Sequence, residues 1–169
     1  MIQQKVWVTL VNLKFKGFLV HLLVQKYQKL DRNINLFLAI ASSSSVGAWA
    51  VWKTLPLVWA SIIVASQVIT VAKPYFPYYK YVKELNSKCL QIESLNLEFE
   101  RLFNLIQRKK LLEDAGWEMY YDFKKQMNEI LSFSDDTIID AKQSVVQEAN
   151  QKMKIFLESE YGITISINS

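Results

Sequence analysis

Two long uncharged stretches dominate the pattern of hydrophobic and polar positions along the chain. The first is the 20 residues between Arg32 and Lys53, and the second is the 19 residues between Lys53 and Lys73. A helix of 20 residues spans roughly 30 Å, the thickness of the hydrocarbon core of a bilayer. A helix of this length in a soluble protein normally has a charged face, and neither stretch has one. The pattern therefore predicts a transmembrane hairpin over residues 33–73, with a buried helical hairpin of a soluble protein as the alternative.

The charges that flank the hairpin predict its orientation. Residues 1–73 contain eight Lys and Arg and one acidic residue, whereas residues 74–169 contain 12 basic and 15 acidic residues. Basic residues precede the first stretch and follow the second, and the turn between them has only Lys53. Because basic flanks stay on the cytoplasmic side, both termini are expected in the cytoplasm.

The first 32 residues mix apolar and aromatic side chains with lysines. Trp7, Phe15 and Phe18 alternate with basic residues, and the uncharged run from Gly17 to Gln25 is too short to span a bilayer. This pattern predicts an amphipathic helix in the inner membrane interface, with its lysines at anionic headgroups. The alternative is an ordinary helix packed on the cytosolic domain. His21, within this segment, is assigned no chemistry.

The two predicted spans are more polar than a simple anchor requires. Five polar residues are candidates for facing a pore: Asn35, Ser42, Ser45, Gln67 and Thr70. Small and hydroxylated side chains also allow helices to approach and to hydrogen-bond, so helix–helix packing is the alternative. Two spans cannot enclose a channel, and a pore would need a ring of subunits. Neither span contains Asp, Glu, Lys or Arg, so any such pore would be weakly selective.

A heptad repeat follows the second span. Apolar residues recur every seven positions from Tyr78 to Ile106, and others lie three positions after most of them. The full set is Tyr78, Leu85, Ile92, Phe99 and Ile106 with Tyr81, Leu95 and Leu102. This spacing predicts a cytosolic stalk helix over residues 74–112 with an apolar coiled-coil seam, in which Lys88 is the polar exception. Periodicity does not decide whether the seam pairs within the chain or between subunits.

Residues 113–169 are expected to form a helical C-terminal region with a short extended tail. Gly116 is expected to interrupt a helical stretch over about 111–133, and Ser134-Asp135-Asp136 is typical of a turn and N-cap. A further helix should then run from 137 to about 158. In residues 161–169, isoleucines alternate with Thr and Ser, a pattern that favours a short strand.

The sequence does not predict an enzyme, a cofactor or a metal site. No motif of a nucleotide-binding, kinase, metalloprotease or hydrolase site is present. The only Cys, Cys89, has no His nearby in the sequence, so a packed thiol is expected rather than a nucleophile.

A basic and aromatic cluster, hereafter the basic–aromatic cluster, is the one candidate ligand site. It consists of Arg108, Lys109, Lys110, Trp117, Tyr121, Lys124 and Lys125. Trp117, Tyr121 and Lys124 would share one face of a helix. Cations beside aromatic rings suit a nucleotide or single-stranded nucleic acid, through phosphate pairing and base stacking. The alternative is a helix with core aromatic residues and solvated lysines.

The order of these segments resembles the SLATT family, the SMODS and SLOG-associating two-transmembrane effectors. The resemblance lies in the Lys-rich first helix, the basic-polar Asp31-Arg32-Asn33 segment, the two-span hairpin, the aromatic segment after it and the long helix that follows. It covers about residues 1–110 and is one of architecture; residues 111–169 are not part of it. It implies a bacterial antiphage-defence effector of the inner membrane, a homo-oligomeric pore that depolarises the infected cell. It also implies a nucleotidyltransferase-type partner, whose nucleotide or oligonucleotide product would contact the basic–aromatic cluster.

The combined expectation is an all-α integral membrane protein that acts as a gated channel. A homo-oligomer of four or more subunits would form the pore, and the cytosolic helices would receive the signal. The alternative is a non-conducting two-span scaffold that recruits a cytosolic partner through its coiled-coil stalk, with Leu95 and Leu102 at the binding surface.

Overall fold

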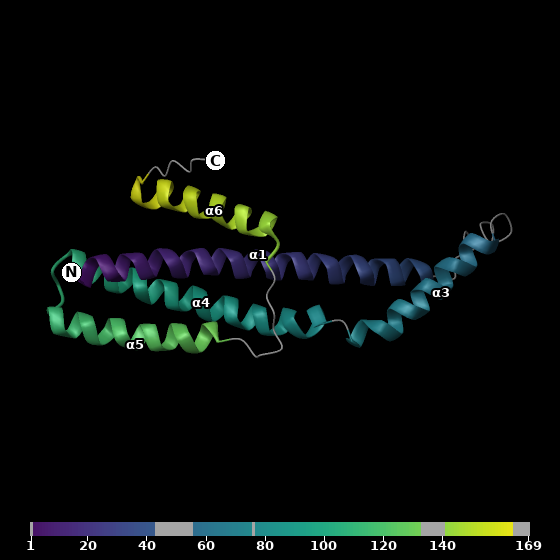
Figure 1. The fold of residues 1–169 in the computed structure, drawn as a ribbon, viewed down its shortest axis with the longest axis horizontal. Helices are drawn as coiled ribbons and strands as arrows, with labels where there is room; N and C mark the ends of the chain where they lie inside the picture. Colours follow the sequence, from purple (N-terminus) through teal and green to yellow (C-terminus); the bar gives the residue numbers. More distant parts are fainter. Residues whose placement is uncertain (1, 43–55, 76, 133–140, 164–169) are drawn as a thin grey trace. The chain divides into compact units, whose positions relative to one another are not determined.

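The computed structural model describes residues 2–42, 56–75, 77–132 and 141–163, and every regular element in them is helical. The elements are α1 (Ile2–Ser42), α3 (Pro56–Ala72), the short 3-10 helix η1 (Lys73–Tyr75), α4 (Pro77–Gln107), α5 (Glu113–Leu131) and α6 (Gln143–Tyr161) (Figure 1). The chain divides into two compact units. Unit 1 comprises Met1–Val24 with Glu84–Ser169, and unit 2 comprises Gln25–Lys83.

The core of unit 1 is the contact between α1 and α4. Five heptad residues of α4 are buried within the chain: Leu85, Ile92, Leu95, Phe99 and Leu102, the last two with no exposed surface. Ile106 is half-buried, and the side chains of Tyr78 and Tyr81 lie outside the described part of the chain. The helices approach closely at Gly17: a Cβ atom there would lie 3.2 Å from Cγ2 of Ile92 and 3.3 Å from Nδ2 of Asn96. The apolar seam therefore pairs within the chain, which answers the question that periodicity left open.

Helix α5 covers one side of the α1–α4 pair. Tyr120 is buried, shares a hydrogen bond of 3.2 Å with the Thr9 hydroxyl, and meets Phe99 edge-on with ring centroids 6.4 Å apart. Near the start of α5, Gly116 is buried, and a Cβ atom there would lie 3.0 Å from Cδ1 of Ile2. These contacts connect α5 to both central helices of unit 1.

Helix α6 lies on the opposite side of the pair (Figure 1). The Tyr161 ring meets Trp7 with centroids 4.7 Å apart, and Phe156 meets Phe18 at 6.2 Å. Lys14 of α1 places its ammonium 4.5 Å from the centre of the Phe156 ring. Burial raises the pKa of the Tyr161 phenol, and the carboxylates of Glu100 and Glu160 raise it further.

The N-terminal part of α1 therefore has protein on three faces. Residues 2, 5 and 9 of α1 contact α5, residue 17 contacts α4, and residue 18 contacts α6. Trp7 and Lys14 contact both α4 and α6. Because a helix turns by roughly 100° per residue, these contacts point in three directions. Leu10, Leu22 and Leu23, which a membrane-surface helix would turn towards lipid, are buried in the protein. This is the arrangement of the alternative expectation, a helix packed on the cytosolic helices. The helix also continues to Ser42 without a break at residue 32.

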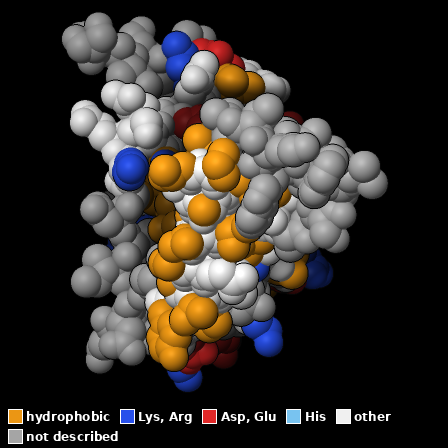
Figure 2. All heavy atoms as spheres, turned by 90° about the vertical axis from the view of Figure 1, so that its right-hand side faces the viewer, with side chains coloured by type: hydrophobic (Ala, Val, Ile, Leu, Met, Phe, Trp, Pro, Cys, Tyr) orange, Lys and Arg blue, Asp and Glu red, His pale blue; other side chains and the backbone are white. Residues whose placement is uncertain are grey.

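Unit 2 contains the apolar helix α3 and the second half of α1. By length and composition, α1 and the segment Pro56–Tyr75 are each long and apolar enough to cross a membrane. Large apolar side chains of α3 are exposed: Leu57, Val58, Val64, Val68 and Val71. Figure 2 shows hydrophobic side chains gathered on the face that it presents. Soluble proteins rarely expose a continuous apolar surface of this kind.

Three boundaries in the C-terminal region differ from the expected ones. Gly116 does not interrupt a helix, because α5 begins at Glu113 and passes through it. Helix α6 begins at Gln143 and not at residue 137; its N-cap is Lys142, and the expected cap at Ser134–Asp136 lies outside the described residues. Helix α6 ends at Gly162, which adopts the left-handed conformation, with φ 64°, that glycine tolerates best. Most of the expected strand, residues 164–169, also lies outside the described part of the chain.

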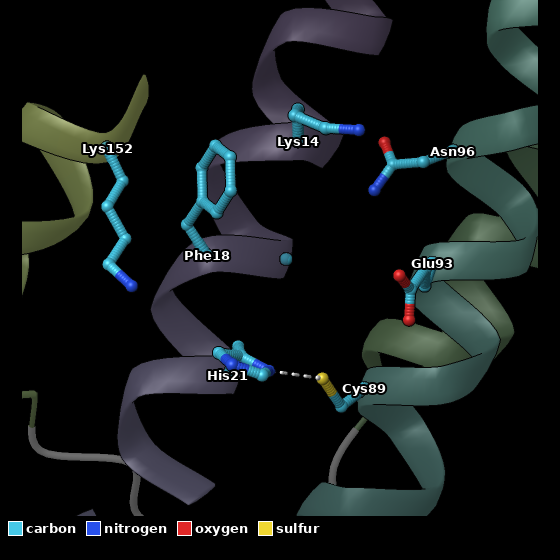
Figure 3. Close-up of a pocket in the computed structure, with 8 residues that line it drawn as sticks. Lys14, Phe18, His21, Cys89, Glu93, Asn96 and Lys152 are labelled. Atoms are coloured by element: carbon cyan, nitrogen blue, oxygen red, sulfur yellow. Dashed lines mark hydrogen bonds between the residues drawn. The ribbon is translucent and has the colours of Figure 1, made fainter. Parts of the chain in front are cut away.

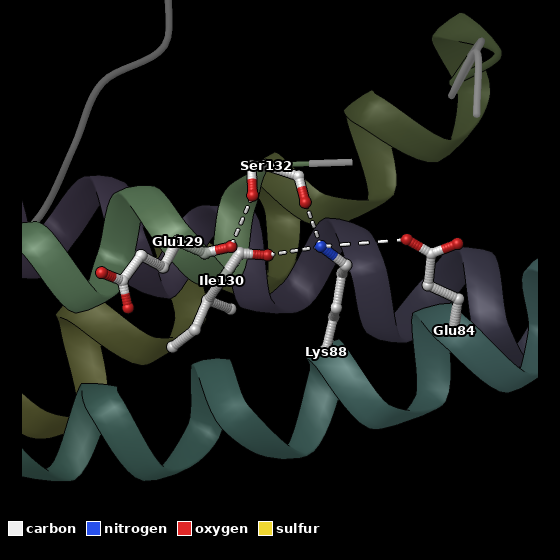
Figure 4. A network of polar contacts seen from close by, with 5 residues as sticks. All are labelled: Glu84, Lys88, Glu129, Ile130 and Ser132. Carbon is white, nitrogen blue, oxygen red and sulfur yellow. Dashed lines mark hydrogen bonds and ion pairs between the residues drawn. The ribbon is translucent and has the colours of Figure 1, made fainter. Parts of the chain in front are cut away.

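Lys88, the polar exception of the heptad seam, caps the end of α5 (Figure 4). Its ammonium donates a hydrogen bond of 2.9 Å to the Ile130 carbonyl oxygen and a second one to that of Ser132, and lies 3.9 Å from the Glu84 carboxylate. The last carbonyls of a helix have no partners within the helix and carry partial negative charge. A lysine is therefore suited to this seam position because the seam meets a helix C-terminus there.

We predict that Lys88→Met lowers the free energy of unfolding by about 1–2 kcal/mol, because the carbonyls of α5 lose a charged donor. The measurement is chemical unfolding of the full chain in detergent. Arg101→Met is the matched control, since Arg101 is exposed on the same helix, and its effect should stay within about 0.5 kcal/mol. Equal losses for the two variants would contradict the capping role.

Candidate functional site

The polar residues expected in a pore are only partly within the described structure. Ser45 lies outside the described residues, and Ser42 is described only as the last residue of α1. Asn35, Gln67 and Thr70 are exposed on their helices. Gln67 and Thr70 belong to α3, and Asn35 belongs to the part of α1 in unit 2.

The hydroxyl groups of α3 are satisfied within the helix itself. Ser61 donates to the Leu57 carbonyl at 2.9 Å, and Thr70 donates to that of Ser66 at 2.8 Å. Ser66 in turn donates to the Ile63 carbonyl at 2.8 Å. Such bonds let a hydroxyl lie in an apolar environment without a partner from another helix.

Gln67 differs from these hydroxyl residues. Within the described part of the chain its carboxamide has no hydrogen-bond partner, and it is exposed. It shares a face of α3 with Val64 and Val71, at spacings of three and four residues, and those side chains are 63% and 70% exposed. Gln67 is thus a hydrogen-bonding group in the middle of an uncovered apolar face.

Asn35 takes part in a contact that the sequence did not predict. Its amide nitrogen donates to Asp31 at 2.9 Å, and its amide oxygen accepts a bond of 2.5 Å from the Lys73 ammonium. Lys73 also lies 3.3 Å from the Asp31 carboxylate. This Asp31–Asn35–Lys73 network connects α1 with the residue that follows α3. Asp31 and Lys73 are far apart in the sequence and belong to no common motif, so only the fold reveals the network.

The aromatic part of the basic–aromatic cluster is assembled on α5. The rings of Trp117 and Tyr121 are stacked at 24°, with centroids 5.8 Å apart, and Tyr121 is 61% exposed. The Lys124 ammonium lies 5.8 Å from the centre of the Tyr120 ring. Lys5 of α1 lies 5.1 Å from the centre of the Trp117 ring. Lys5 was missed from the sequence because it is more than 100 positions away from α5.

The basic part of the cluster forms the turn after α4, where Arg108, Lys109 and Lys110 are all exposed. The Lys110 amide donates to the Leu105 carbonyl and the Lys109 amide to that of Ile106, both at 3.0 Å. This is the hydrogen-bond pattern of a Schellman C-cap, whose left-handed position is usually glycine. Here Lys109 occupies it, with φ 52°. The turn therefore keeps a cation at a position where a side chain is strained.

A cysteine and a histidine that are distant in the sequence come together in unit 1. Cys89 Sγ lies 3.8 Å from Nδ1 of His21 (Figure 3). Burial raises the pKa of the Cys89 thiol, and the Glu93 carboxylate adds to the effect. The thiol is thus held in its protonated form, which does not favour a nucleophile. Among the residues that the structure describes, no group of three or more His, Cys, Asp or Glu could hold a metal ion.

Comparisons with known proteins do not identify the chain: no family model, no curated protein and no solved structure matches it. Membership of the SLATT family accordingly stays a prediction from the order of the segments.

We predict a measurable coupling between Asp31 and Lys73. In a double-mutant cycle with Asp31→Asn and Lys73→Met, the coupling free energy should be about 0.5–1 kcal/mol at low salt, because both side chains are only partly exposed. Thermal or chemical unfolding in detergent provides the readout. The control cycle pairs Asp31→Asn with Lys29→Met, whose side chain is exposed two positions away and does not face Asp31. A coupling no larger than in the control cycle would refute the network.

We also predict that Lys109→Gly stabilises the protein by about 0.5–1 kcal/mol. Glycine removes the strain of the left-handed position, and this gain exceeds the extra conformational entropy that a glycine loses on folding. Lys110→Gly removes the same charge from the next position and should not stabilise. Comparing the unfolding midpoints of the two variants tests this; a gain for both, or for neither, would show that the strain at Lys109 is unimportant.

Proposed function

We propose that this protein is a two-span membrane protein whose homo-oligomer forms a gated, weakly selective pore. Its activity would be to depolarise a bacterial inner membrane as an antiphage-defence effector. Both termini and unit 1 would lie in the cytoplasm, as the basic flanks of the hairpin indicate. The exposed apolar side chains of α3 support the membrane location, because they would otherwise be in water.

Gln67 is the observation on which the pore proposal depends. A carboxamide at membrane depth must contact protein or water, because lipid offers no hydrogen-bond partner. The described chain offers Gln67 no partner, whereas the hydroxyls of the same helix are satisfied locally. A ring of subunits that places Gln67 and its face towards a water-filled centre would satisfy it. Thr70, one turn from Ser66 and Gln67, would line the same lumen.

The gating signal is assigned to the basic–aromatic cluster. The half-buried Trp117 is stacked on the exposed Tyr121, and lysines from two helices lie beside aromatic rings there, an arrangement suited to a base and its phosphates. Lys5 belongs to α1, the helix whose later residues enter unit 2, so a ligand at the cluster would act on the helix that leads into the hairpin. The ligand would be a nucleotide or oligonucleotide made by a nucleotidyltransferase-type partner, and the ligand opens or closes the pore according to which state it binds more tightly.

The scaffold alternative loses its expected docking surface. Leu95 and Leu102 are 3% and 0% exposed within the chain. A charge at either position would disrupt the core of unit 1, so these residues are not available to a partner protein.

The test is the membrane potential of a bacterial host that expresses the chain alone, compared with a variant that lacks residues 34–73. Depolarisation that requires these residues supports a pore. If the potential is stable while the protein is in the membrane, purified protein in liposomes is assayed for ion flux with and without added nucleotides. Absence of flux in every condition would refute the pore.

We predict that Gln67→Leu reduces this flux several-fold while the oligomer still assembles, because an apolar lumen excludes water. The matched control is Val68→Leu, which changes the adjacent exposed side chain of α3 but introduces no change in polarity. Oligomer size is followed by crosslinking in the same samples. Unchanged flux in Gln67→Leu would place Gln67 outside the pore.

A further inference from the structure

A cleft in unit 1 contains polar groups that the proposed function does not use. Its volume is about 310 Å³, and α1, α4 and α6 all contribute side chains to it (Figure 3). Gly17, Phe18 and His21 come from α1, with Lys14 at one end. Cys89, Glu93 and Asn96 come from α4, and Lys152 comes from α6. Ligand sites in proteins begin at about this size.

The carboxamide of Asn96 is the unusual group in this cleft. Asn96 is 4% exposed, and its Oδ1 atom is buried without a hydrogen-bond partner in the described structure. Figure 3 shows its side chain pointing from α4 into the cleft. A buried carbonyl oxygen without a donor is unfavourable, and folded proteins rarely leave one. The cleft therefore has a place for a hydrogen-bond donor.

The charges of the cleft are also incompletely paired. Lys14 is engaged: its ammonium lies 3.1 Å from Glu100 and over the Phe156 ring. Glu93, which is exposed, and Lys152, which is half-buried, form no ion pair within the residues that the structure describes. The acid belongs to α4 and the base to α6, so the cleft offers one charge of each sign from two different helices.

We infer that this cleft binds a small zwitterion of the α-amino acid class. The ammonium group of the ligand would donate to the Glu93 carboxylate and to Oδ1 of Asn96, and its carboxylate would accept from the Lys152 ammonium. A ligand with one charge only would leave either Glu93 or Lys152 with water as its partner, whereas a zwitterion pairs with both. The Phe18 ring and the Cys89 thiol supply apolar surface for the ligand's side chain.

This inference does not depend on the pore, because every group in it belongs to unit 1. Burial raises the pKa of the Cys89 thiol, so the thiol contributes an uncharged surface to the cleft. The Asn96 carboxamide packs against Gly17, where an added Cβ atom would lie 3.3 Å from its amide nitrogen.

The experiment is thermal unfolding of the full-length protein in detergent with each of the common L-amino acids in turn. We expect at least one to raise the unfolding temperature in a saturable manner, because a ligand that binds only the folded state stabilises it. The N-acetyl derivative and the methyl ester of that amino acid, which each lack one charge, should have no effect. If no amino acid raises the unfolding temperature, or if the two derivatives act equally well, the inference is wrong.

Variants of the cleft residues test whether the ligand-induced rise in unfolding temperature comes from binding in this cleft. Glu93→Gln and Lys152→Met should each abolish the ligand-induced shift, while Glu98→Gln, an exposed acid of the same helix outside the cleft, should retain it. Asn96→Leu gives a second readout, the stability of the protein without ligand. Because the substitution removes the unpaired oxygen, this variant should unfold at a higher temperature without ligand and should no longer respond to ligand. A full response in Glu93→Gln or in Asn96→Leu would overturn the assignment.

Discussion

The close contact of α1 with α4 is the constraint on which the rest of unit 1 depends. A glycine at position 17 lets the two backbones approach, and Ile92 and Asn96 pack where a larger side chain would lie. Once this pair has formed, α1 has two further faces, and aromatic residues on each attach a separate helix. Tyr120 connects α5 through Thr9 and Phe99, and Tyr161 connects α6 through Trp7. These three contacts bury apolar side chains, and such burial is the dominant favourable contribution to folding.

Much of the helical pattern is predictable from the sequence, but the partners of each helix are not. The seven-residue repeat predicts the seam of α4 correctly, and Leu85, Ile92, Phe99 and Leu102 are all buried. The same repeat cannot say whether the seam faces another subunit or α1. For the first 24 residues, the mixture of aromatic residues and lysines is typical of a membrane surface, but it is equally typical of a helix surrounded by three others.

The candidate sites show the same limit. The stacking of Trp117 on Tyr121 follows from a spacing of four residues on one helix, and it could be predicted. Two contacts join segments more than 60 residues apart: Lys5 with Trp117, and His21 with Cys89. Spacing along one helix cannot predict contacts between residues so distant in the sequence. Lys88 is instructive for another reason: a charged residue in an apolar seam suggests a defect, and only the position of the end of α5 shows that it is a cap.

Helix α3 satisfies its polar groups in a different way from the core of unit 1. In unit 1, polar side chains bond across helices, as Thr9 does with Tyr120 and Lys14 with Glu100. On α3, the hydroxyls bond to their own helix, which suits a helix without a polar environment.

Against this background two carboxamides, Gln67 on α3 and Asn96 on α4, have unmet hydrogen-bonding capacity in the described chain. The carboxamide of Gln67 is exposed on an apolar face and has no partner among the described residues, so the proposed pore satisfies it with water. The carboxamide of Asn96 is buried at a cleft whose exposed acid and half-buried base form no ion pair among the described residues, so the group that we infer to satisfy it is small and carries a donor. An exposed amide in an apolar surface and a buried amide in a charged cleft thus call for different partners, and this is why the pore and the ligand cleft are separate proposals about one chain.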